Sequence, residues 1–98
     1  METTMDRVRY LTLIEPALKL VEKKHEDYNT GIQLEMYFPF ADASYVHMLN
    51  TKTLRLIASI HNPKRNFESV EDSVLDLVNY AVFYLDYLKK AKVCAPTK

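Results

Sequence analysis

Tryptophan is absent from this 98-residue chain, and glycine occurs once, at Gly31. Because glycine supplies the positive backbone angles of most tight turns, its scarcity argues against a β-rich fold and against a glycine-rich phosphate loop. The single cysteine, Cys94, excludes an intramolecular disulfide and a cysteine-rich zinc site. These shortages favour a helical protein in a reducing compartment, which we expect to be the cytoplasm.

An excess of charge is also lacking, because 13 Lys and Arg residues balance 13 Asp and Glu residues. No global charge therefore attracts the protein to DNA or to an anionic membrane, and non-specific nucleic-acid binding is disfavoured. No apolar run approaches the ~20 residues of a membrane span, and residues 1–10 hold no apolar signal-peptide segment. We expect a protein that does not contact membranes.

The length limits the number of cores to one, since 98 residues with 48% hydrophobic content cannot build two. We expect a single all-α domain over residues 1–98, ordered over residues 5–92 with a frayed tail at 93–98. Apolar residues recur at helical spacing in three segments, which predict a small bundle of three main helices. We expect these side chains to face the core: Val8, Leu11, Ile14, Leu18 and Val21; Val46, Leu49, Leu56, Ile57 and Ile60; and Val70, Val74, Leu77, Ala81, Leu85 and Leu88.

The ends of the helices follow from proline and from capping residues. The first helix begins within residues 4–6 and runs to about residue 27, and Pro16 either kinks it or splits it in two. The second starts at Asp42 or Ser44, either of which can cap it, and ends near residue 60. The third starts with Ser69 or Asn66 as its cap and ends within residues 89–92.

A long connection, residues 28–42, joins the first two helices and is rich in aromatic residues. Loops of this length in small domains are often lids or binding loops, and aromatic rings provide surfaces on which a base can stack. Alternatively, the rings close the open end of a helical bundle. The aromatic residues in or next to this connection are Tyr28, Tyr37, Phe38, Phe40 and Tyr45.

A polar stripe interrupts the apolar pattern of the third helix, because Asp72, Asp76 and Asn79 share one side of it. A half-buried carboxylate is costly unless it meets a cation or several hydrogen-bond donors. The stripe therefore marks either a structural ion-pair network or a ligand or metal site. On the second helix, Lys52 and Arg55 either form a clamp for phosphate or pair with these two aspartates.

A magnesium site is the only metal-dependent option that the residues support. Glu22 and Glu26 share one side of the first helix and could complete a four-carboxylate site with Asp72 and Asp76, although a solvated helix end is the favoured explanation of these two residues. The three histidines lack zinc-ligand spacing, and no serine or cysteine lies in a nucleophile motif. Metal-assisted chemistry is thus the one enzymatic possibility, and binding without catalysis is favoured.

Four segments follow one another along the chain: KKHEDYN (23–29), YFPF (37–40), SYVHMLNTKTLRL (44–56) and NFESVEDSVLDLVNYA (66–81). In their sequences and their order, these segments resemble small phage and prophage proteins of the nucleotide-modification-associated domain family. The resemblance covers most of the chain and implies an association with nucleotides in an infected bacterial cell. The resemblance implies that the following residues of this chain match the family's pattern: Lys24, Asp27, Tyr28, Lys52, Arg55, Leu56, Glu68, Ser69, Asp72, Asp76, Asn79, Tyr80 and Ala81.

The chain is also distantly similar to the all-α nucleoside-triphosphate pyrophosphatases of the MazG type, which bind magnesium through carboxylates on paired helices. Those enzymes carry Glu-x-x-Glu and Glu-x-x-Asp pairs, whereas Glu22 and Glu26, like Asp72 and Asp76, are four residues apart. This second resemblance implies a helical scaffold and a site large enough for a nucleotide.

We therefore predict a protein that binds a nucleotide or nucleotide-like ligand between its helices, with Lys52 and Arg55 on phosphate. The other ligand contacts are Lys24, Asp27, Tyr28, Asp72, Asp76, Asn79 and Tyr80. Three alternatives stay open: a magnesium-dependent nucleoside-triphosphate pyrophosphatase, a phage counter-defence protein that sequesters a cyclic-nucleotide signal or inhibits a host protein, and a structural interaction module.

The third helix also predicts self-association, since apolar residues lie on more than one of its sides. Exposing so much apolar surface in so small a domain would be unusual for a monomer. We expect a homodimer or a larger assembly built on the second or third helix. The residues that widen the apolar surface are Leu75, Val78, Val82 and Phe83.

Overall fold

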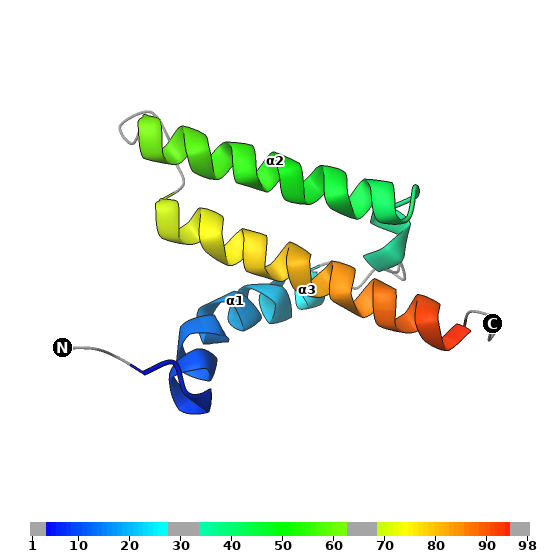
Figure 1. The fold of residues 1–98 in the computed structure, drawn as a ribbon, viewed down its shortest axis with the longest axis horizontal. Coiled ribbons are helices and arrows are strands. Elements are labelled where there is room, and N and C mark those ends of the chain that lie inside the picture. The colour runs from blue at the N-terminus through cyan, green and yellow to red at the C-terminus, as the bar shows by residue number, and fades with distance from the viewer. Residues whose placement is uncertain (1–3, 28–33, 63–68, 95–98) are drawn as a thin grey trace.

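The computed structural model of the chain describes residues 4–27, 34–62 and 69–94, and the side chains of these except at positions 24–27, 34 and 92–94. The described residues form helices and contain no strand, so the prediction of a small all-α bundle is confirmed (Figure 1). The elements are α1 (Arg7–Asp27), the short 3-10 helix η1 (Leu34–Tyr37), α2 (Asp42–His61) and α3 (Val70–Cys94).

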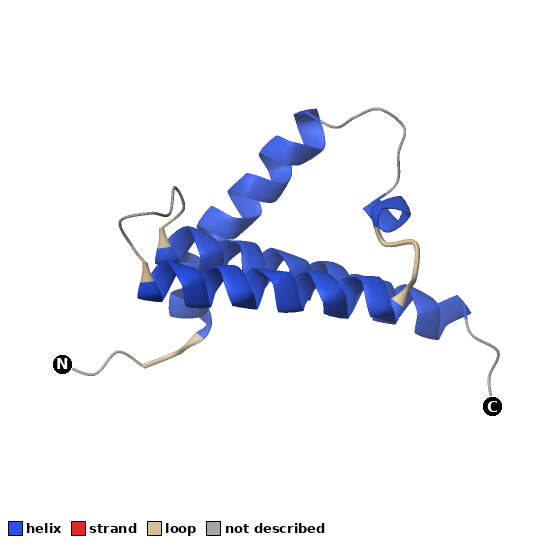
Figure 2. Cartoon of the chain, turned by 90° about the horizontal axis from the view of Figure 1, so that it is seen from above, coloured by secondary structure: helices blue, strands red, loops and turns tan. Residues whose placement is uncertain are grey.

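Helix α3 lies at the centre and contacts both other helices. In Figure 1, α2 lies along one side of α3, running antiparallel to it, and α1 lies on the other side. Figure 2, seen from above, shows that α1 crosses this pair obliquely. Within the described residues, no helix is both long enough and apolar enough to span a membrane.

The first helix is continuous from Arg7 to Asp27 and contains Pro16. Asp6 caps it, because its Oδ1 accepts a hydrogen bond of 2.9 Å from the backbone N–H of Arg9. Figure 1 shows α1 bent between its two halves, as expected where proline removes a backbone donor. Of the two outcomes expected at Pro16, the structure shows the kink and not the split.

The prediction that Asp42 or Ser44 caps α2 is wrong. The N-cap residue is Ala41, which has a φ of 53° and no side-chain cap bond. The Ser44 hydroxyl instead accepts a hydrogen bond of 2.8 Å from the backbone N–H of Phe40 in the preceding turn. Asp42 is likewise engaged elsewhere, since its carboxylate accepts a hydrogen bond of 2.9 Å from the Tyr84 hydroxyl of α3.

The beginning of α3 is as the sequence predicts, whereas its end is later. The Ser69 hydroxyl accepts a hydrogen bond of 3.0 Å from the backbone N–H of Asp72, which is an N-cap bond. The helix continues to Cys94, beyond the predicted end within residues 89–92. Two residues of the expected frayed tail are thus helical, and residues 95–98 lie outside the described part of the chain.

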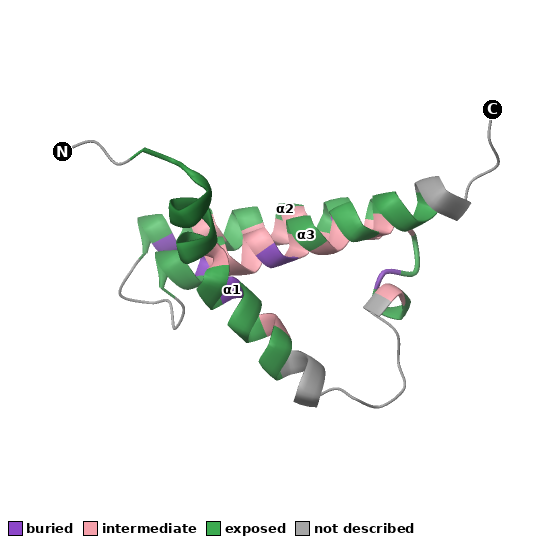
Figure 3. Cartoon of the chain, turned by 90° about the horizontal axis from the view of Figure 1, so that it is seen from below, coloured by how far each residue is buried: buried purple, intermediate pink, exposed green. Residues whose placement is uncertain are grey.

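The predicted core side of α3 is wrong. Helix α3 turns its tyrosines and Asp76 toward α2, and the apolar stripe about 100° away around the helix is left at the surface. Figure 3 shows little buried surface along the bundle. Among the predicted core residues, those exposed are Val8, Leu11, Leu18, Val46, Ile57, Ile60, Val70, Val74, Ala81, Leu85 and Leu88, whereas Ile14, Val21, Leu49, Leu56 and Leu77 are half-buried.

Aromatic rings form much of the actual core. Tyr45 of α2 is only 2% exposed and stacks on Phe38 with ring centroids 4.0 Å apart. The rings of Tyr84 and Tyr87 of α3 lie 5.2 and 5.0 Å from that of Tyr45. Phe38 thus packs on the rings of Tyr45 of α2 and Tyr80 of α3, whereas the closing of the bundle by the whole aromatic connection stays a prediction.

The lid interpretation covers the whole connection, residues 28–42, of which residues 28–33 lie outside the described residues, and it stays a prediction. Two aromatic residues in the described part of the connection, Tyr37 and Phe40, are exposed. The connection therefore contributes one aromatic side chain to the core and presents two others at the surface.

Candidate functional site

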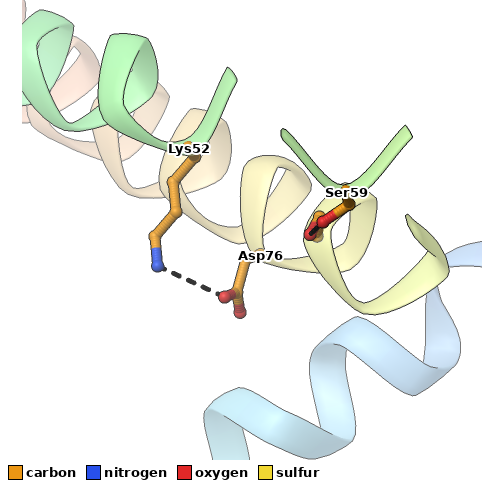
Figure 4. A network of polar contacts seen from close by, with 4 residues as sticks. Lys52, Ser59 and Asp76 are labelled. Atoms are coloured by element: carbon orange, nitrogen blue, oxygen red, sulfur yellow. Dashed lines mark hydrogen bonds and ion pairs between the residues drawn. The ribbon is translucent and has the colours of Figure 1, made fainter. Parts of the chain in front are cut away.

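An ion pair joins α2 to α3 near the middle of the bundle. Lys52 Nζ of α2 lies 3.3 Å from Asp76 Oδ2 of α3 (Figure 4). The two side chains are only 12% and 17% exposed, so both charged groups are largely removed from water. Of the alternatives for the polar stripe, the structure shows that an ion pair is present, and it shows that Lys52 provides the cation.

The ring of Tyr80, one turn beyond Asp76 on α3, forms the other contact of this lysine. Lys52 Nζ lies 5.1 Å from the ring centroid, which is a cation–π geometry. An ammonium group has three N–H donors, and the contacts with Asp76 and Tyr80 leave donor capacity at the interface of α2 and α3. Lys52, Asp76 and Tyr80 are therefore the predicted site residues that the fold brings together.

Two buried serines lie next to this group along the same interface. The hydroxyl oxygens of Ser59 and Ser73 are 3.5 Å apart, and the Ser59 hydroxyl donates a hydrogen bond of 3.0 Å to the carbonyl of Arg55 (Figure 4 shows Ser59). The small side chains let the two helices approach closely at this level. The contact is polar and fully internal, so its evident effect is to align α2 with α3.

Asn79, which was predicted to contact the ligand, serves the fold. Its side-chain amide is buried and donates a hydrogen bond of 3.1 Å to the carbonyl of Ala17 in α1. The same amide therefore determines where α1 crosses α3. The bond uses one of the two N–H donors of the amide, but the residue is only 9% exposed, so little of it is accessible to a ligand.

The remaining predicted residues do not join the Lys52–Asp76 pair. Arg55 and Asp72 are exposed, on α2 and on the first turn of α3, and Glu22 is exposed on α1. Lys24, Glu26, Asp27 and Tyr28 lie outside the residues whose side chains the structure describes. Their predicted ligand contacts stay predictions.

The magnesium site cannot be assembled from the described side chains alone. Among these there is no group of three His, Cys, Asp or Glu residues placed to hold a metal ion. The ammonium group of Lys52 lies beside the Asp76 carboxylate. It occupies the position that a metal ion would take if Asp76 were one of its ligands. Because Glu26 lies outside the described side chains, the four-carboxylate set stays a prediction.

Sequence reasoning missed a surface tether between η1 and α3. Lys90 Nζ lies 2.6 Å from Glu35 Oε1 and 3.0 Å from Asp86 Oδ2. The hydrogen bond from Lys90 lowers the pKa of Glu35 from its ordinary value, and the same bond raises the pKa of Lys90. The four-residue spacing of Asp86 and Lys90 is a signal that the sequence offered, but nothing local indicated Glu35.

A second missed contact involves the phenol of Tyr84. Its hydrogen bond to Asp42 raises the pKa of Tyr84, with a smaller contribution from burial. This bond and the Glu35–Lys90 pair both hold the segment before α2 against the last turns of α3. The end of the bundle is therefore fastened by polar contacts around a stacked aromatic centre.

Comparisons of the chain with protein-family models, with curated protein sequences and with solved structures found no match. The fold and the geometry of the interface between α2 and α3 are thus what bears on function.

Proposed function

We propose that the protein binds a nucleotide or nucleotide-like anion at the interface of α2 and α3, with Lys52 as the contact to phosphate. The observation that carries this proposal is the state of Lys52, whose side chain is 12% exposed and whose ammonium meets one carboxylate and one aromatic ring. A desolvated ammonium with donor capacity left is suited to a phosphate oxygen.

Arg55 supplies the second cation of the proposed site. It follows Lys52 by three residues, which places it about 60° around α2 and less than one turn further along. Its exposed guanidinium presents a planar fork of donors that matches a phosphate group. Asp76 holds Lys52 in position until the ligand arrives, and the ring of Tyr80 lies beside the ammonium.

The resemblance to nucleotide-modification-associated domain proteins supports a nucleotide as the anion. By the same resemblance we propose that the protein acts in the cytoplasm of an infected bacterium. The apolar residues on more than one side of α3 support the proposal that it does so as a homo-oligomer. A cyclic-nucleotide signal of the host is one ligand of this chemistry. Sequestration of such a signal would make the protein a counter-defence factor without any catalysis.

A second candidate, a helical interaction module, is favoured by the exposed apolar residues of α2 and α3. In that case the Lys52–Asp76 pair only aligns the helices, and the partner is another protein, such as a host protein. The two candidates differ in one measurable respect, because only the first requires affinity for nucleotides.

The test is titration calorimetry with nucleoside mono-, di- and triphosphates, cyclic nucleotides and pyrophosphate, each with and without magnesium. Arg55→Met should lower the affinity for the bound nucleotide by about 10-fold or more, because charge-assisted hydrogen bonds are lost. Since Arg55 is exposed, the free energy of unfolding of the Arg55→Met variant should be lower than that of wild type by less than about 1 kcal/mol. Lys19→Met is the matched control, because Lys19 is 72% exposed on α1 and pairs with Glu15 of the same helix.

Two results would contradict the binding proposal. One is the absence of heat and of thermal stabilisation with every ligand at millimolar concentration, which would leave the interaction module. The other is an equal loss of affinity in Arg55→Met and Lys19→Met, which would indicate a general charge effect. Product analysis in the same samples tests catalysis: magnesium-dependent hydrolysis that is lost in Asp76→Asn would assign the protein as a pyrophosphatase.

A further inference from the structure

Nine large apolar side chains among the described residues of α2 and α3 each keep between 41% and 59% of their area exposed, and seven of the nine follow one stripe on each helix. We call these seven the apolar face. On a typical monomer, apolar residues of this size are scattered singly, and a contiguous group marks a contact with another molecule. The members of the apolar face are Val46, Ile57 and Ile60 of α2 and Val70, Val74, Leu85 and Leu88 of α3.

The geometry of the helices places both stripes on the same side of the α2–α3 pair. At about 100° per residue, each stripe is turned by about 100–120° from the side by which its helix meets the other, marked by Lys52 on α2 and by Tyr80 on α3, whose ring Lys52 contacts. Both rotations have the same sense, and the helices run antiparallel (Figure 1). Two such stripes face the same direction and form one surface two helices wide.

Helix α1 does not cover this surface. Its contact with α3 is marked by Asn79, which bonds to Ala17. Asn79 lies about 150° around α3 from the middle of the apolar stripe. The apolar face is therefore on the side of α3 that neither α1 nor α2 occupies.

The spacing along both helices is that of a helical bundle. Residues repeat at intervals of three and four, as in the heptads of helices that pack on one another through interlocking side chains. Neither series contains a charged residue. The two series are Val46, Leu49, Thr53, Leu56 and Ile60 on α2, and Val70, Val74, Leu77, Ala81, Leu85 and Leu88 on α3.

The accessible surface area of the chain is larger than that expected of a compact monomer, and the difference can be compared with the area that a dimer interface buries. The accessible area is 8438 Å², whereas a compact monomer of 11.5 kDa should expose about 5,800 Å². The excess is about 2,600 Å², and obligate homodimers bury about 1,000–2,500 Å² on each subunit. The radius of gyration agrees, since it is 15.9 Å where a compact chain of this length has about 13 Å.

We propose that a second copy of this chain packs on the apolar face, so that the α2–α3 pairs of two subunits form a four-helix bundle around a two-fold axis. A two-fold axis brings the same face of both subunits together, and an uncharged face is complementary to itself. This inference does not rest on nucleotide binding. It rests on the exposed side chains, their spacing and the surface area.

The test begins with the mass in solution, measured by light scattering and sedimentation at micromolar concentration. Wild type should have twice the monomer mass of 11.5 kDa. Val74→Glu combined with Leu85→Glu should weaken association by at least about 100-fold, because two charges would be buried in an apolar interface. Leu18→Glu is the matched control and should stay dimeric, since Leu18 is 56% exposed on α1, which is not part of the proposed interface.

A labelling experiment keeps the proposal testable if the double variant does not fold. Leu85→Cys and Leu18→Cys are compared in a Cys94→Ser background. In the subunit Leu85 and Leu18 are 54% and 56% exposed, so a monomer would present both thiols to a reagent equally. In the proposed dimer the thiol at position 85 should react at least about tenfold more slowly, and dilution should remove the difference.

Three results would overturn the proposal. The first is a mass of 11.5 kDa for wild type up to millimolar concentration. The second is equal labelling of the two thiols at every protein concentration. The third is a dimer that persists in the double glutamate variant but dissociates in Leu18→Glu, which would place the interface on α1.

Discussion

The side-chain amide of Asn79 in α3 donates a hydrogen bond of 3.1 Å to the backbone carbonyl of Ala17 in α1. Both residues are buried, and they are 62 positions apart in the sequence. Apolar contacts between helices tolerate sliding and rotation, whereas a hydrogen bond requires one distance and one direction. This bond therefore determines the point at which α1 crosses α3.

The first prediction concerns this bond. Asn79→Asp should lower the free energy of unfolding by about 3 kcal/mol, because a carboxylate would face the Ala17 carbonyl with no donor between them. Asn79→Ala should cost less, about 1–2 kcal/mol, since it removes the donor without burying a charge. Urea unfolding followed by circular dichroism measures both values. Equal stability of all three proteins would show that the crossing point does not depend on this amide.

The second prediction concerns the Lys52–Asp76 pair. Lys52→Met and Asp76→Asn should each cost about 2 kcal/mol, between the ~0–1 kcal/mol of an exposed pair and the ~3–5 kcal/mol of a broken buried pair. The double variant should be more stable than the sum of the two single effects predicts, by about 1–2 kcal/mol. A double-mutant cycle in urea measures this coupling. Strict additivity would mean that the two charges do not stabilise one another.

The third prediction concerns the aromatic core. Tyr45→Ala should cost about 3–5 kcal/mol, because it removes a ring that stacks on Phe38, Tyr84 and Tyr87. Tyr45→Phe should cost less than about 1 kcal/mol, since it keeps the ring and its contacts. Thermal unfolding compares the two variants. A similar loss in both would assign the stabilising effect to the hydroxyl and not to the stacked ring.

The fourth prediction concerns pH and the tether between η1 and α3. The hydrogen bond from Lys90 lowers the pKa of Glu35 below its ordinary value of 4.5, so ionised Glu35 stabilises the folded state. This stabilisation is fully present above that ordinary value and is lost as the pH falls through the lowered pKa of the folded state. Glu35→Gln should therefore lower the melting temperature at pH 7 and have little effect at pH 2.

Because Glu35 and Lys90 are partly exposed, the difference at pH 7 should also shrink in 1 M salt. Glu15→Gln is the control, since Glu15 and Lys19 form an exposed pair within α1. The control variant should change the melting temperature by less than Glu35→Gln does. A constant difference between wild type and Glu35→Gln from pH 2 to pH 7 would contradict the role of the ionised pair.

Local features of the sequence were enough to predict the helices. Scarce glycine and apolar residues at helical spacing predicted three helices, and Ser69 with Asp72 correctly marked the start of α3. Pro16 predicted a disturbance in α1, where the structure has a bend. These features act within one or two turns, so the residues that cause them are neighbours in the sequence.

The tertiary structure alone decided which side of each helix is buried. The third helix has two candidate sides, an apolar one through Val74 and Leu85 and a polar and aromatic one through Asp76 and Tyr80. Periodicity favoured the apolar side as core, but the subunit buries the other, where rings stack and Lys52 meets Asp76. The pattern describes which side is apolar and not which molecule covers it.

The choice of partners within the site also required the tertiary structure. Lys52 and Arg55 are both cations on α2 and lie less than one turn apart, so the sequence could assign either of them to Asp76. A shift of α2 along α3 by one helical turn, about 5.4 Å, would exchange the residues that face each other. The stacking of Tyr45 and the contact between Ser59 and Ser73 set that register. By itself, the sequence determined the helices and the residue types they carry, whereas packing determined which of those residues meet.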